Sequence, residues 1–233
     1  MKAFILAAGN GTRLRPLTDS VPKCLLPIQG VPLLAIWLEN CRSAGITDVL
    51  VNAHLHANQV RAFVRQANLP PRVQVVEEKN LLGSAGTLDE NRSFVHQEDA
   101  FFVLYGDVLT NVSLGGLMEF HRSRKKLATL GICQVADPSR CGIVTTDDDG
   151  TVRSFVEKPA RPETNWAFAG VMIASPRVLD FVPSDRPADI GFHLLPLLIG
   201  HMSACVIGDY LLDIGTLENY RAAESSWPGL RKG

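Results

Sequence analysis

Residues 1–24 read MKAFILAAGNGTRLRPLTDSVPKC, and this stretch decides the fold class. The apolar run at residues 3–8 has the length of a buried strand and is too short to cross a bilayer. Gly9 and Gly11 follow it and allow the backbone to turn sharply. Free N–H groups in such a turn form an anion site, to which Arg13 and Lys23 add positive charge. We therefore expect a strand followed by a phosphate-binding loop.

Two common phosphate-binding motifs are absent from this loop. The dinucleotide fingerprint needs a third glycine where Leu14 stands, which disfavours a dehydrogenase. The P-loop needs Gly-Lys-Ser/Thr, and residues 12–14 do not supply it. Taken alone, the Gly-x-Gly pattern is equally consistent with an ordinary turn.

The composition is that of a globular protein and excludes several partner classes. The 233 residues are 46% hydrophobic and 20% charged, enough to bury a core in one domain. The net charge of −1 gives no electrostatic case for nucleic acid or an anionic membrane. Five scattered cysteines without a Cys-x-x-Cys pair indicate reduced thiols in a cytoplasmic protein. We expect no signal peptide and no membrane-spanning helix.

Strand-like and helix-like runs alternate through the first half of the chain. We expect strands at residues 3–8, 47–53, 73–76 and 100–105, and helices at 32–43 and 58–67. This order predicts an α/β fold, a Rossmann-like, mostly parallel sheet with helices on both faces. Asp149-Gly150 between residues 141–144 and 152–156 predicts a β-hairpin. Further expected elements are a helix at 114–124, strands at 127–134, 166–174 and 204–207, and helices at 176–181 and 189–200. We also expect a final helix through about Glu224, with Thr216 as its N-cap.

Three charged features lie at or near the ends of these elements. Asp107 directly follows a buried strand, a place that suits a Mg²⁺ ligand or an ordinary turn. Glu78 precedes a glycine loop in which we expect Ser84 to cap the next helix. Its carboxylate could accept hydrogen bonds from a ligand. The basic residues Arg122, Arg124, Lys125 and Lys126 are interpreted as the solvated end of a helix.

Residues 6–18, Leu-Ala-Ala-Gly-Asn-Gly-Thr-Arg-Leu-Arg-Pro-Leu-Thr, together with Pro22-Lys23, resemble the signature of the sugar-1-phosphate nucleotidyltransferases. The resemblance covers nearly the whole chain. It implies that Arg13 and Lys23 act at the phosphates as catalytic residues. The nucleotide-binding set that it implies is Leu6, Ala8, Gly9, Gly11, Thr12, Arg13, Glu78, Gly83 and Asp107.

Later segments resemble the rest of the family's pattern in the family's order. Asp107 in Tyr-Gly-Asp and Asp213 in Asp-Ile-Gly-Thr look like its two metal ligands, which implies Mg²⁺ as cofactor. The implied sugar-phosphate set is Gly142, Glu157, Lys158 and Gly170. Phe168 stands where relatives often carry Asn, so the choice of sugar stays open.

The resemblance also implies a reaction and a domain plan. An NTP and a sugar 1-phosphate would give a nucleotide sugar and pyrophosphate, with GTP and a mannose- or heptose-like sugar favoured. UTP- or dTTP-using enzymes, and a catalytically silent regulatory subunit that binds nucleotide sugar, are the alternatives. We expect a single domain at 1–233, with a nucleotide part at about 1–110 and a sugar-phosphate part at about 111–225. A homodimer, and the absence of the C-terminal β-helix domain of longer relatives, are further expectations.

Overall fold

The computed structural model describes residues 1–67 and 71–231, which form two compact units. The first unit contains Met1–Leu81, Leu104–Gly115 and Asp209–Gly233. The second contains Leu82–Val103 and Gly116–Gly208. The two units are interleaved along the chain, so each is assembled from segments that are far apart in sequence.

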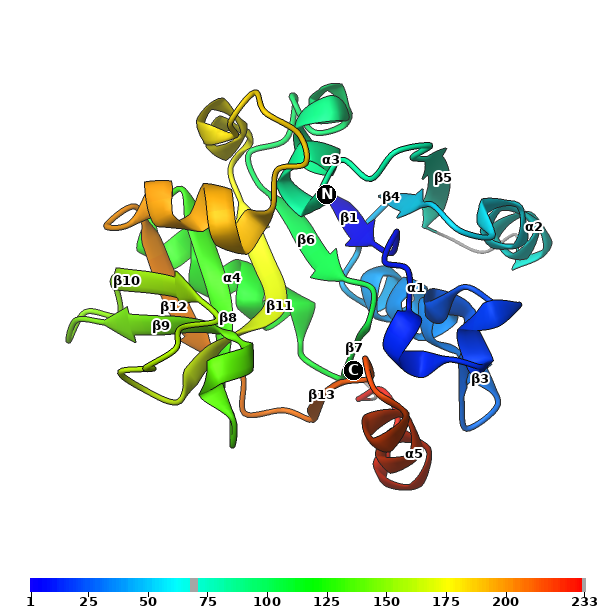
Figure 1. The fold of residues 1–233 in the computed structure, drawn as a ribbon. Helices are drawn as coiled ribbons and strands as arrows, with labels where there is room; N and C mark the ends of the chain where they lie inside the picture. Colours follow the sequence, from blue (N-terminus) through cyan, green and yellow to red (C-terminus); the bar gives the residue numbers. More distant parts are fainter. Residues whose placement is uncertain (68–70, 232–233) are drawn as a thin grey trace. The chain divides into compact units, whose positions relative to one another are not determined.

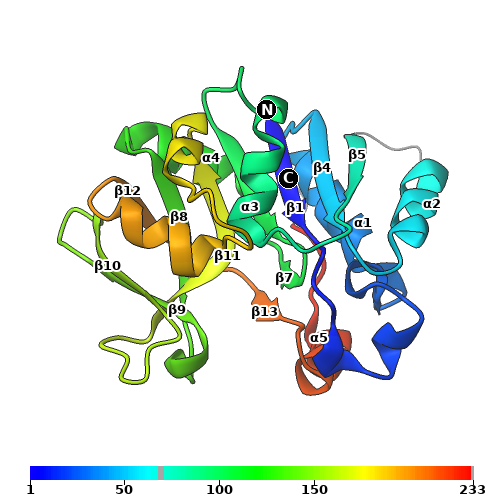
Figure 2. The same ribbon diagram turned by 45° about the horizontal axis from the view of Figure 1, so that its top comes forward.

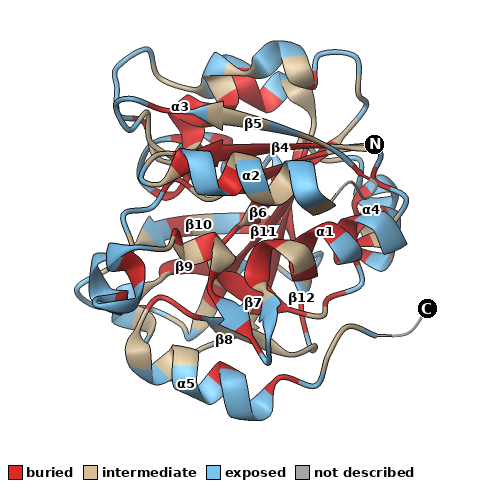
Figure 3. Ribbon diagram, turned by 90° about the vertical axis from the view of Figure 1, so that its right-hand side faces the viewer, coloured by how far each residue is buried: buried red, intermediate tan, exposed pale blue. Residues whose placement is uncertain are grey.

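The first unit is built on a parallel sheet, as the opening stretch predicts. Strands β1 (Lys2–Leu6), β4 (Asp48–Ala53) and β5 (Arg72–Glu77) pair in parallel, with β4 in the middle (Figure 1). Helices α1 (Leu33–Ser43) and α2 (Ala57–Ala67) connect successive strands. Figure 3 shows β4 mostly buried, whereas most of α2 is exposed or of intermediate burial. Gly45 follows α1 with a φ of +71°, a conformation that suits glycine.

Short elements complete this unit and hold its functional loops. They are η1 (Thr12–Leu14), η2 (Leu17–Asp19), η3 (Lys23–Leu25), β2 (Pro27–Ile28), β3 (Val31–Pro32), β7 (Val108–Thr110), β13 (Leu211–Asp213) and α5 (Leu217–Ser226). Strands β7 and β13 form an antiparallel pair that joins the middle of the chain to its last segment. The Thr216 side chain accepts a hydrogen bond from the Asn219 N–H at 3.2 Å, which confirms Thr216 as the N-cap of α5.

The second unit has a mixed sheet in which β8 (Ala128–Gln134) pairs with two strands. It runs antiparallel to β11 (Trp166–Ala174) and parallel to β12 (Met202–Val206). The predicted hairpin is present as β9 (Gly142–Thr146) and β10 (Val152–Glu157), which Figure 2 shows in green. At its turn, Asp147 accepts hydrogen bonds from the N–H groups of Asp149 and Thr151.

The remaining elements are mostly short helices. They are α3 (Ser84–Glu90), η4 (Arg92–Phe94), α4 (Leu114–Arg124), η5 (Pro138–Arg140), η6 (Pro176–Phe181), η7 (Ile190–Leu194) and η8 (Leu195–Leu198), together with the strand β6 (Phe101–Tyr105). The predicted helix at 189–200 is a π-helical turn followed by a 3-10 turn. The prediction that Ser84 caps α3 is wrong, because Gly83 occupies the cap and the Ser84 hydroxyl binds elsewhere.

The α/β class is confirmed, with parallel pairing throughout the sheet of the first unit and mixed pairing in the second. The central strands consist largely of buried apolar residues, which explains this outcome. Examples that are 0% exposed are Phe4, Val51, Phe102 and Leu130. Among the described residues, no helix is long and apolar enough to cross a bilayer.

Truncation of a core side chain in β1 tests how far the first unit depends on this strand. Phe4 is 0% exposed, and we expect Phe4→Ala to lower the free energy of unfolding by about 3–5 kcal/mol because it leaves a cavity. Urea denaturation followed by circular dichroism measures the change. Leu55→Ala is the control, since Leu55 is 45% exposed and its truncation should change the stability by about 0.5 kcal/mol or less. Equal effects of the two substitutions would contradict the assignment of β1 to the core.

Candidate functional site

The predicted site residues separate into two groups, one in each unit. The first unit holds Leu6, Ala8, Gly9, Gly11, Thr12, Arg13, Lys23, Glu78, Asp107 and Asp213. The second holds Gly83, Gly142, Glu157, Lys158 and Gly170. The predicted phosphate and metal residues therefore share one unit, and the predicted sugar-phosphate residues share the other.

The β7–β13 pair places the two predicted metal ligands on neighbouring positions. Asp107 directly precedes β7, and Asp213 ends β13 opposite Val108. The Ile214 N–H donates a hydrogen bond to the Asp107 carbonyl oxygen at 3.0 Å, which continues the ladder. A short backbone pairing thus joins two carboxylates that lie far apart in the sequence.

Lys23 supplies the positive charge at this carboxylate pair. Its Nζ lies 2.7 Å from Asp107 Oδ2, and its side chain is only 10% exposed. The preceding Pro22 is buried, and Lys23 opens the short helix η3. The predicted cation and the predicted metal ligand are therefore in direct contact.

Gly215 marks the point where these charged groups converge. A Cβ atom at Gly215 would lie 2.7 Å from Asp213 Oδ1, 2.9 Å from Arg13 Nη2 and 3.3 Å from Lys23 Nζ. The Gly215 N–H also donates a hydrogen bond to Asp213 Oδ1 at 2.6 Å. The sequence analysis did not include Gly215 among the site residues, although its place in Asp-Ile-Gly-Thr was a signal.

The charge balance at Asp213 favours a cation. Burial raises the pKa of the Asp213 carboxyl, and the negative charge of Asp107 raises it further. Lys23, the Gly215 N–H and Arg13 act in the opposite direction. A divalent cation bound beside Asp213 would favour the ionised form of this carboxyl.

The donor set fits a cation that takes only some of its ligands from protein. Within the described residues, no group of three or more His, Cys, Asp or Glu side chains could hold a metal ion. Asp107 and Asp213 alone match the use of Mg²⁺ with triphosphates, in which one or two carboxylates are joined by phosphate oxygens and water. These two residues would hold such an ion.

The glycine loop after β1 has one glycine fixed by the fold and one that faces open space. Gly11 has a φ of +62°, and a Cβ there would lie 2.9 Å from the Thr18 methyl carbon. The Thr18 hydroxyl donates to the Gly11 carbonyl at 2.7 Å and so closes the loop. No atom lies within 4 Å of a Cβ built at Gly9, which leaves room at the exposed side of the loop.

Glu78 is part of a buried hydrogen-bonded chain that leads back to β1. Asn52 Nδ2 donates to Glu78 Oε1 at 2.8 Å, and Asn52 Oδ1 accepts from the Ala7 N–H at 2.7 Å. Glu78 is 6% exposed. The sequence analysis missed Asn52, although a polar residue inside the buried run at 49–53 is a signal for such a role. Glu78 is thus fixed relative to the end of β1.

In the second unit, two glycines make room for the Glu157 carboxylate. A Cβ at Gly142 would lie 2.7 Å from Glu157 Oε2, and one at Gly191 would lie 2.3 Å from the same atom. Gly191, at the start of η7, has no positive φ that would require glycine, so its lack of a side chain reflects the closeness of Glu157. Lys158 Nζ lies 3.6 Å from Glu157 Oε1.

The electrostatic environment of Glu157 differs from that of an exposed carboxylate. Burial raises its pKa, the neighbouring Lys158 lowers it, and the charge of Asp189 raises it. Lys158 also lies 5.6 Å from the centre of the Phe192 ring, a cation–π distance. The Glu157 carboxylate and the Lys158 ammonium group are therefore neighbours, and Lys158 also contacts the Phe192 ring.

Ser84 and Asp189 connect the glycine loop at residues 83–87 with the turn that carries Gly191. The Ser84 hydroxyl donates to Asp189 Oδ2 at 3.0 Å and accepts from the Ile190 N–H at 2.7 Å. Asp189 Oδ1 accepts from the Gly191 N–H at 2.9 Å. The sequence analysis did not include Asp189 among the functional candidates, and its distance from Ser84 in sequence gave no signal for this pairing.

Two predicted ligand-binding glycines have backbone roles in this structure. Gly83 has a φ of +78°, and a Cβ there would lie 2.3 Å from the Ala188 carbonyl oxygen. Gly170 has a φ of +71° and lies where the β11–β8 register shifts between Phe168 and Met172. Both residues are needed as glycine whether or not a ligand approaches them, and their binding roles stay predictions.

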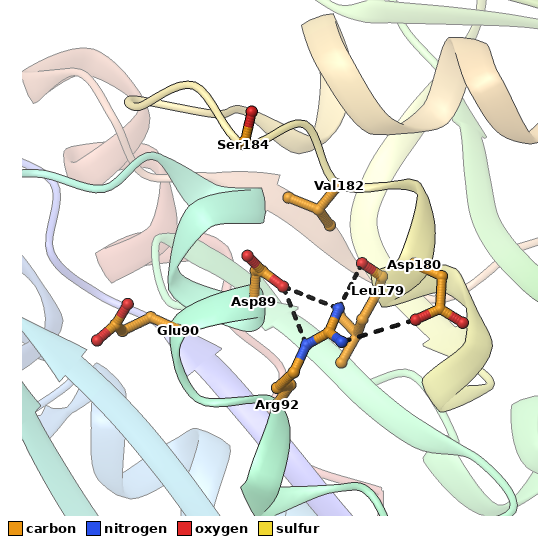
Figure 4. A pocket seen from close by; sticks show the side chains of 7 residues that line it. All are labelled: Asp89, Glu90, Arg92, Leu179, Asp180, Val182 and Ser184. Atoms are coloured by element: carbon orange, nitrogen blue, oxygen red, sulfur yellow. Dashed lines mark hydrogen bonds and ion pairs between the residues drawn. The ribbon is translucent and has the colours of Figure 1, made fainter.

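A hollow of about 630 Å³ in the second unit lies apart from these residues. Figure 4 shows the Arg92 side chain in contact with Asp89 and Asp180. Arg92 also donates to the Leu179 carbonyl at 2.8 Å. Its charge is therefore neutralised by the walls of the hollow, and none of the predicted site residues lines this hollow.

Comparison with known proteins finds relatives that match nearly the whole chain. Residues 2–227 match the family model described as nucleotidyl transferase. The chain is 33% identical to the mannose-1-phosphate guanylyltransferase of Mycobacterium tuberculosis, over 94% of this chain and 62% of that protein. It is 34% identical to the UTP–glucose-1-phosphate uridylyltransferase of Synechocystis sp., over 94% of this chain and 61% of that protein.

A solved structure gives the same fold. HddC from Yersinia pseudotuberculosis superposes with a TM-score of 0.81 at 26% identity, and the match covers 96% of this chain and 98% of that one. HddC has also been crystallised with GMP-PN. The chain spans only about 62% of the length of the M. tuberculosis relative. The family match nevertheless covers almost every residue, and the chain belongs to the nucleotidyl transferase family.

Proposed function

We propose that this protein transfers a nucleotidyl group from an NTP to a sugar 1-phosphate and releases pyrophosphate. The observation that carries the proposal is the convergence of Arg13, Lys23, Asp107 and Asp213 around Gly215. The two cations suit the phosphates of an NTP, and the carboxylate pair suits a divalent metal ion. Cells present nucleoside triphosphates as complexes with such an ion. Family membership and the relatives that act on sugar 1-phosphates support the same reaction.

Each group has a defined task in this proposal. The loop at Gly9 and Gly11 binds the triphosphate through its backbone, and Arg13 and Lys23 balance the charge at the phosphorus under attack. Asp107 and Asp213 hold the metal, which we propose is Mg²⁺ and which would polarise the phosphate oxygens.

The second substrate is assigned to the residues of the second unit. Lys158 binds the phosphate of the sugar 1-phosphate, and Glu157 accepts hydrogen bonds from sugar hydroxyls. Gly142 leaves room beside Glu157. The attacking phosphate oxygen is already ionised, so the reaction depends on positioning and charge stabilisation and needs no general base.

We favour GTP and a mannose- or heptose-like sugar phosphate. The M. tuberculosis relative is a mannose-1-phosphate guanylyltransferase, and the similar HddC structure was obtained with GMP-PN. The Glu78 carboxylate, held by Asn52, can accept hydrogen bonds from the N–H groups of guanine. The Synechocystis relative uses UTP, which keeps a UTP- or dTTP-using enzyme as the second candidate.

A pyrophosphate-release assay tests the proposal directly. The protein is incubated with Mg²⁺, each NTP in turn and a panel of sugar 1-phosphates. We expect pyrophosphate with one NTP in clear excess over the others. Nucleotide-sugar binding without pyrophosphate across the panel would instead indicate a silent regulatory subunit.

We also propose a cytoplasmic location, which the five free cysteines support.

Substitution of a metal ligand separates catalysis from folding. We expect Asp107→Asn to lower kcat by about 100-fold or more, because it removes a charge that holds the metal and pairs with Lys23. Steady-state kinetics at saturating Mg²⁺ measure the loss, and circular dichroism checks the fold. Asp148→Asn, an exposed residue of the hairpin turn, is the control and should retain full activity. Turnover near the wild-type rate in Asp107→Asn would remove Asp107 from the metal site.

Substitution of Lys158 tests the assignment of the second substrate. We expect Lys158→Met to raise KM for the sugar 1-phosphate by about 10- to 100-fold, the value of one charge-assisted hydrogen bond, with little change in KM for the NTP. Initial rates with each substrate varied in turn measure both constants. Arg122→Met is the control in the same unit, since Arg122 is exposed and outside the predicted site. A rise in KM for the NTP alone would place Lys158 at the nucleotide.

A further inference from the structure

A second hollow in the second unit, of about 620 Å³, gathers positive charge, and none of the proposed reaction-site residues lines it. Lys125 and Lys126 reach it from the end of α4, and Arg177 reaches it from η6. His121 and His201 also line it, and Asp99 is the one carboxylate among its lining residues. Its volume is within the range of small-molecule pockets.

The structure divides the basic run at residues 122–126 into two parts. Arg124 lies 4.7 Å from the Phe120 ring centre and donates to the Asp149 carbonyl at 3.2 Å. Lys125 and Lys126 instead line the hollow. The interpretation of the whole run as a solvated helix end therefore describes only part of it.

The cations of this hollow differ from Arg92 in the hollow of Figure 4. Arg92 is paired with carboxylates, whereas neither Lys125 nor Arg177 has an ion pair within residues 1–67 and 71–231. Lys126 Nζ donates to the Gly200 carbonyl at 3.0 Å, which fixes it at the wall. The charges of Lys125 and Arg177 remain for a ligand or for solvent.

Local structure alone does not account for the cations. The C-terminal end of a helix carries a partial negative charge equivalent to about half an elementary charge, which one lysine balances. Arg177 belongs to a different element, so the dipole of α4 does not explain it. Lys125 also has a φ of +52°, a conformation in which glycine or asparagine is favoured, as Gly45 is after α1. The backbone conformation at this position therefore does not favour lysine.

One wall of the hollow is a rigid polar chain. His121 is 7% exposed, and its Nδ1 lies 2.9 Å from Thr129 Oγ1. Thr129 Oγ1 lies in turn 2.9 Å from Ser203 Oγ. The buried ring is therefore fixed through Nδ1, which leaves Nε2 as its second polar atom.

We propose that this hollow binds a small, hydroxylated phosphate monoester. Arg and Lys side chains are the usual ligands of a phosphoryl group, and Lys125, Lys126 and Arg177 supply three positive charges. Asp99 disfavours a second phosphate and accepts a hydrogen bond from a ligand hydroxyl. Its lining residues include neither Lys158 nor any of the residues around Gly215, so the proposed binding does not depend on the proposed nucleotidyl transfer.

Binding of glucose 6-phosphate and of inorganic phosphate, measured by isothermal titration calorimetry without NTP or metal, tests the site. Sodium chloride at matched ionic strength controls for general screening. We expect saturable binding of glucose 6-phosphate to the wild type, weaker by about 10-fold or more in Lys125→Gly and in Arg177→Gln. Lys125→Gly removes the charge and relieves the backbone, so a loss of binding there cannot be attributed to unfolding.

The control variant is Arg122→Gln, which removes a charge from the same helix end but does not line the hollow. We expect it to bind glucose 6-phosphate as the wild type does. Unchanged affinity in Lys125→Gly and Arg177→Gln, an equal loss in Arg122→Gln, or no saturable binding at millimolar concentration would each overturn the proposal. Binding of inorganic phosphate alone, without glucose 6-phosphate, would overturn the assigned ligand class.

Discussion

The pairing of β7 with β13 fixes Asp107 and Asp213 as neighbours, and this places two acidic groups together in a partly buried site. Burial and the negative charge of Asp107 both raise the pKa of the Asp213 carboxyl. The Lys23 ammonium group at 2.7 Å from Asp107 offsets part of this cost. The surrounding segments supply the compensating groups. Lys23 and Arg13 bring positive charge, and the Gly215 N–H donates to Asp213.

The second unit also holds a carboxylate out of full contact with solvent, and it does so with glycines that leave room for the carboxylate oxygens. The Glu157 carboxylate is half-buried, and one of its oxygens lies where side chains at Gly142 and Gly191 would otherwise stand. Ser84 and Asp189 fix the turn that presents Gly191, so the space beside Glu157 depends on a hydrogen bond between distant segments. The placement of one carboxylate thus constrains residues on several elements.

The sequence was sufficient to predict the parts that depend on local pattern. The strand before Gly9, the hairpin at Asp149-Gly150 and the N-cap at Thr216 follow from apolar runs, turn chemistry and capping, and all are present. Ser84 was misassigned because its hydroxyl has a tertiary partner, Asp189, that competes with a local capping role. Partners of this kind are set by packing.

The same reasoning explains which site residues were missed. Gly191 has a helical backbone that any residue could adopt, and only the Glu157 oxygen beside it excludes a side chain. In the sequence, Asn52 is one residue of an expected strand. The structure shows that its amide joins the Ala7 N–H to the Glu78 carboxylate. The partners of Gly191 and Asn52 are distant in the sequence, so no local pattern revealed these contacts.

The interleaved order of the two units has a consequence for how the carboxylate pair forms. Lys23, Asp107 and Asp213 come from three separate segments of the first unit. The β7–β13 ladder joins the last of these to the Asp107 segment, and the α5 segment that follows is tied to β2 by the Tyr220 hydroxyl, which donates to the Pro27 carbonyl at 2.7 Å. Contacts so distant in sequence carry a large loop-closure cost and are expected to form late in folding. The pair of carboxylates is therefore a property of the unit in which β13 is paired with β7.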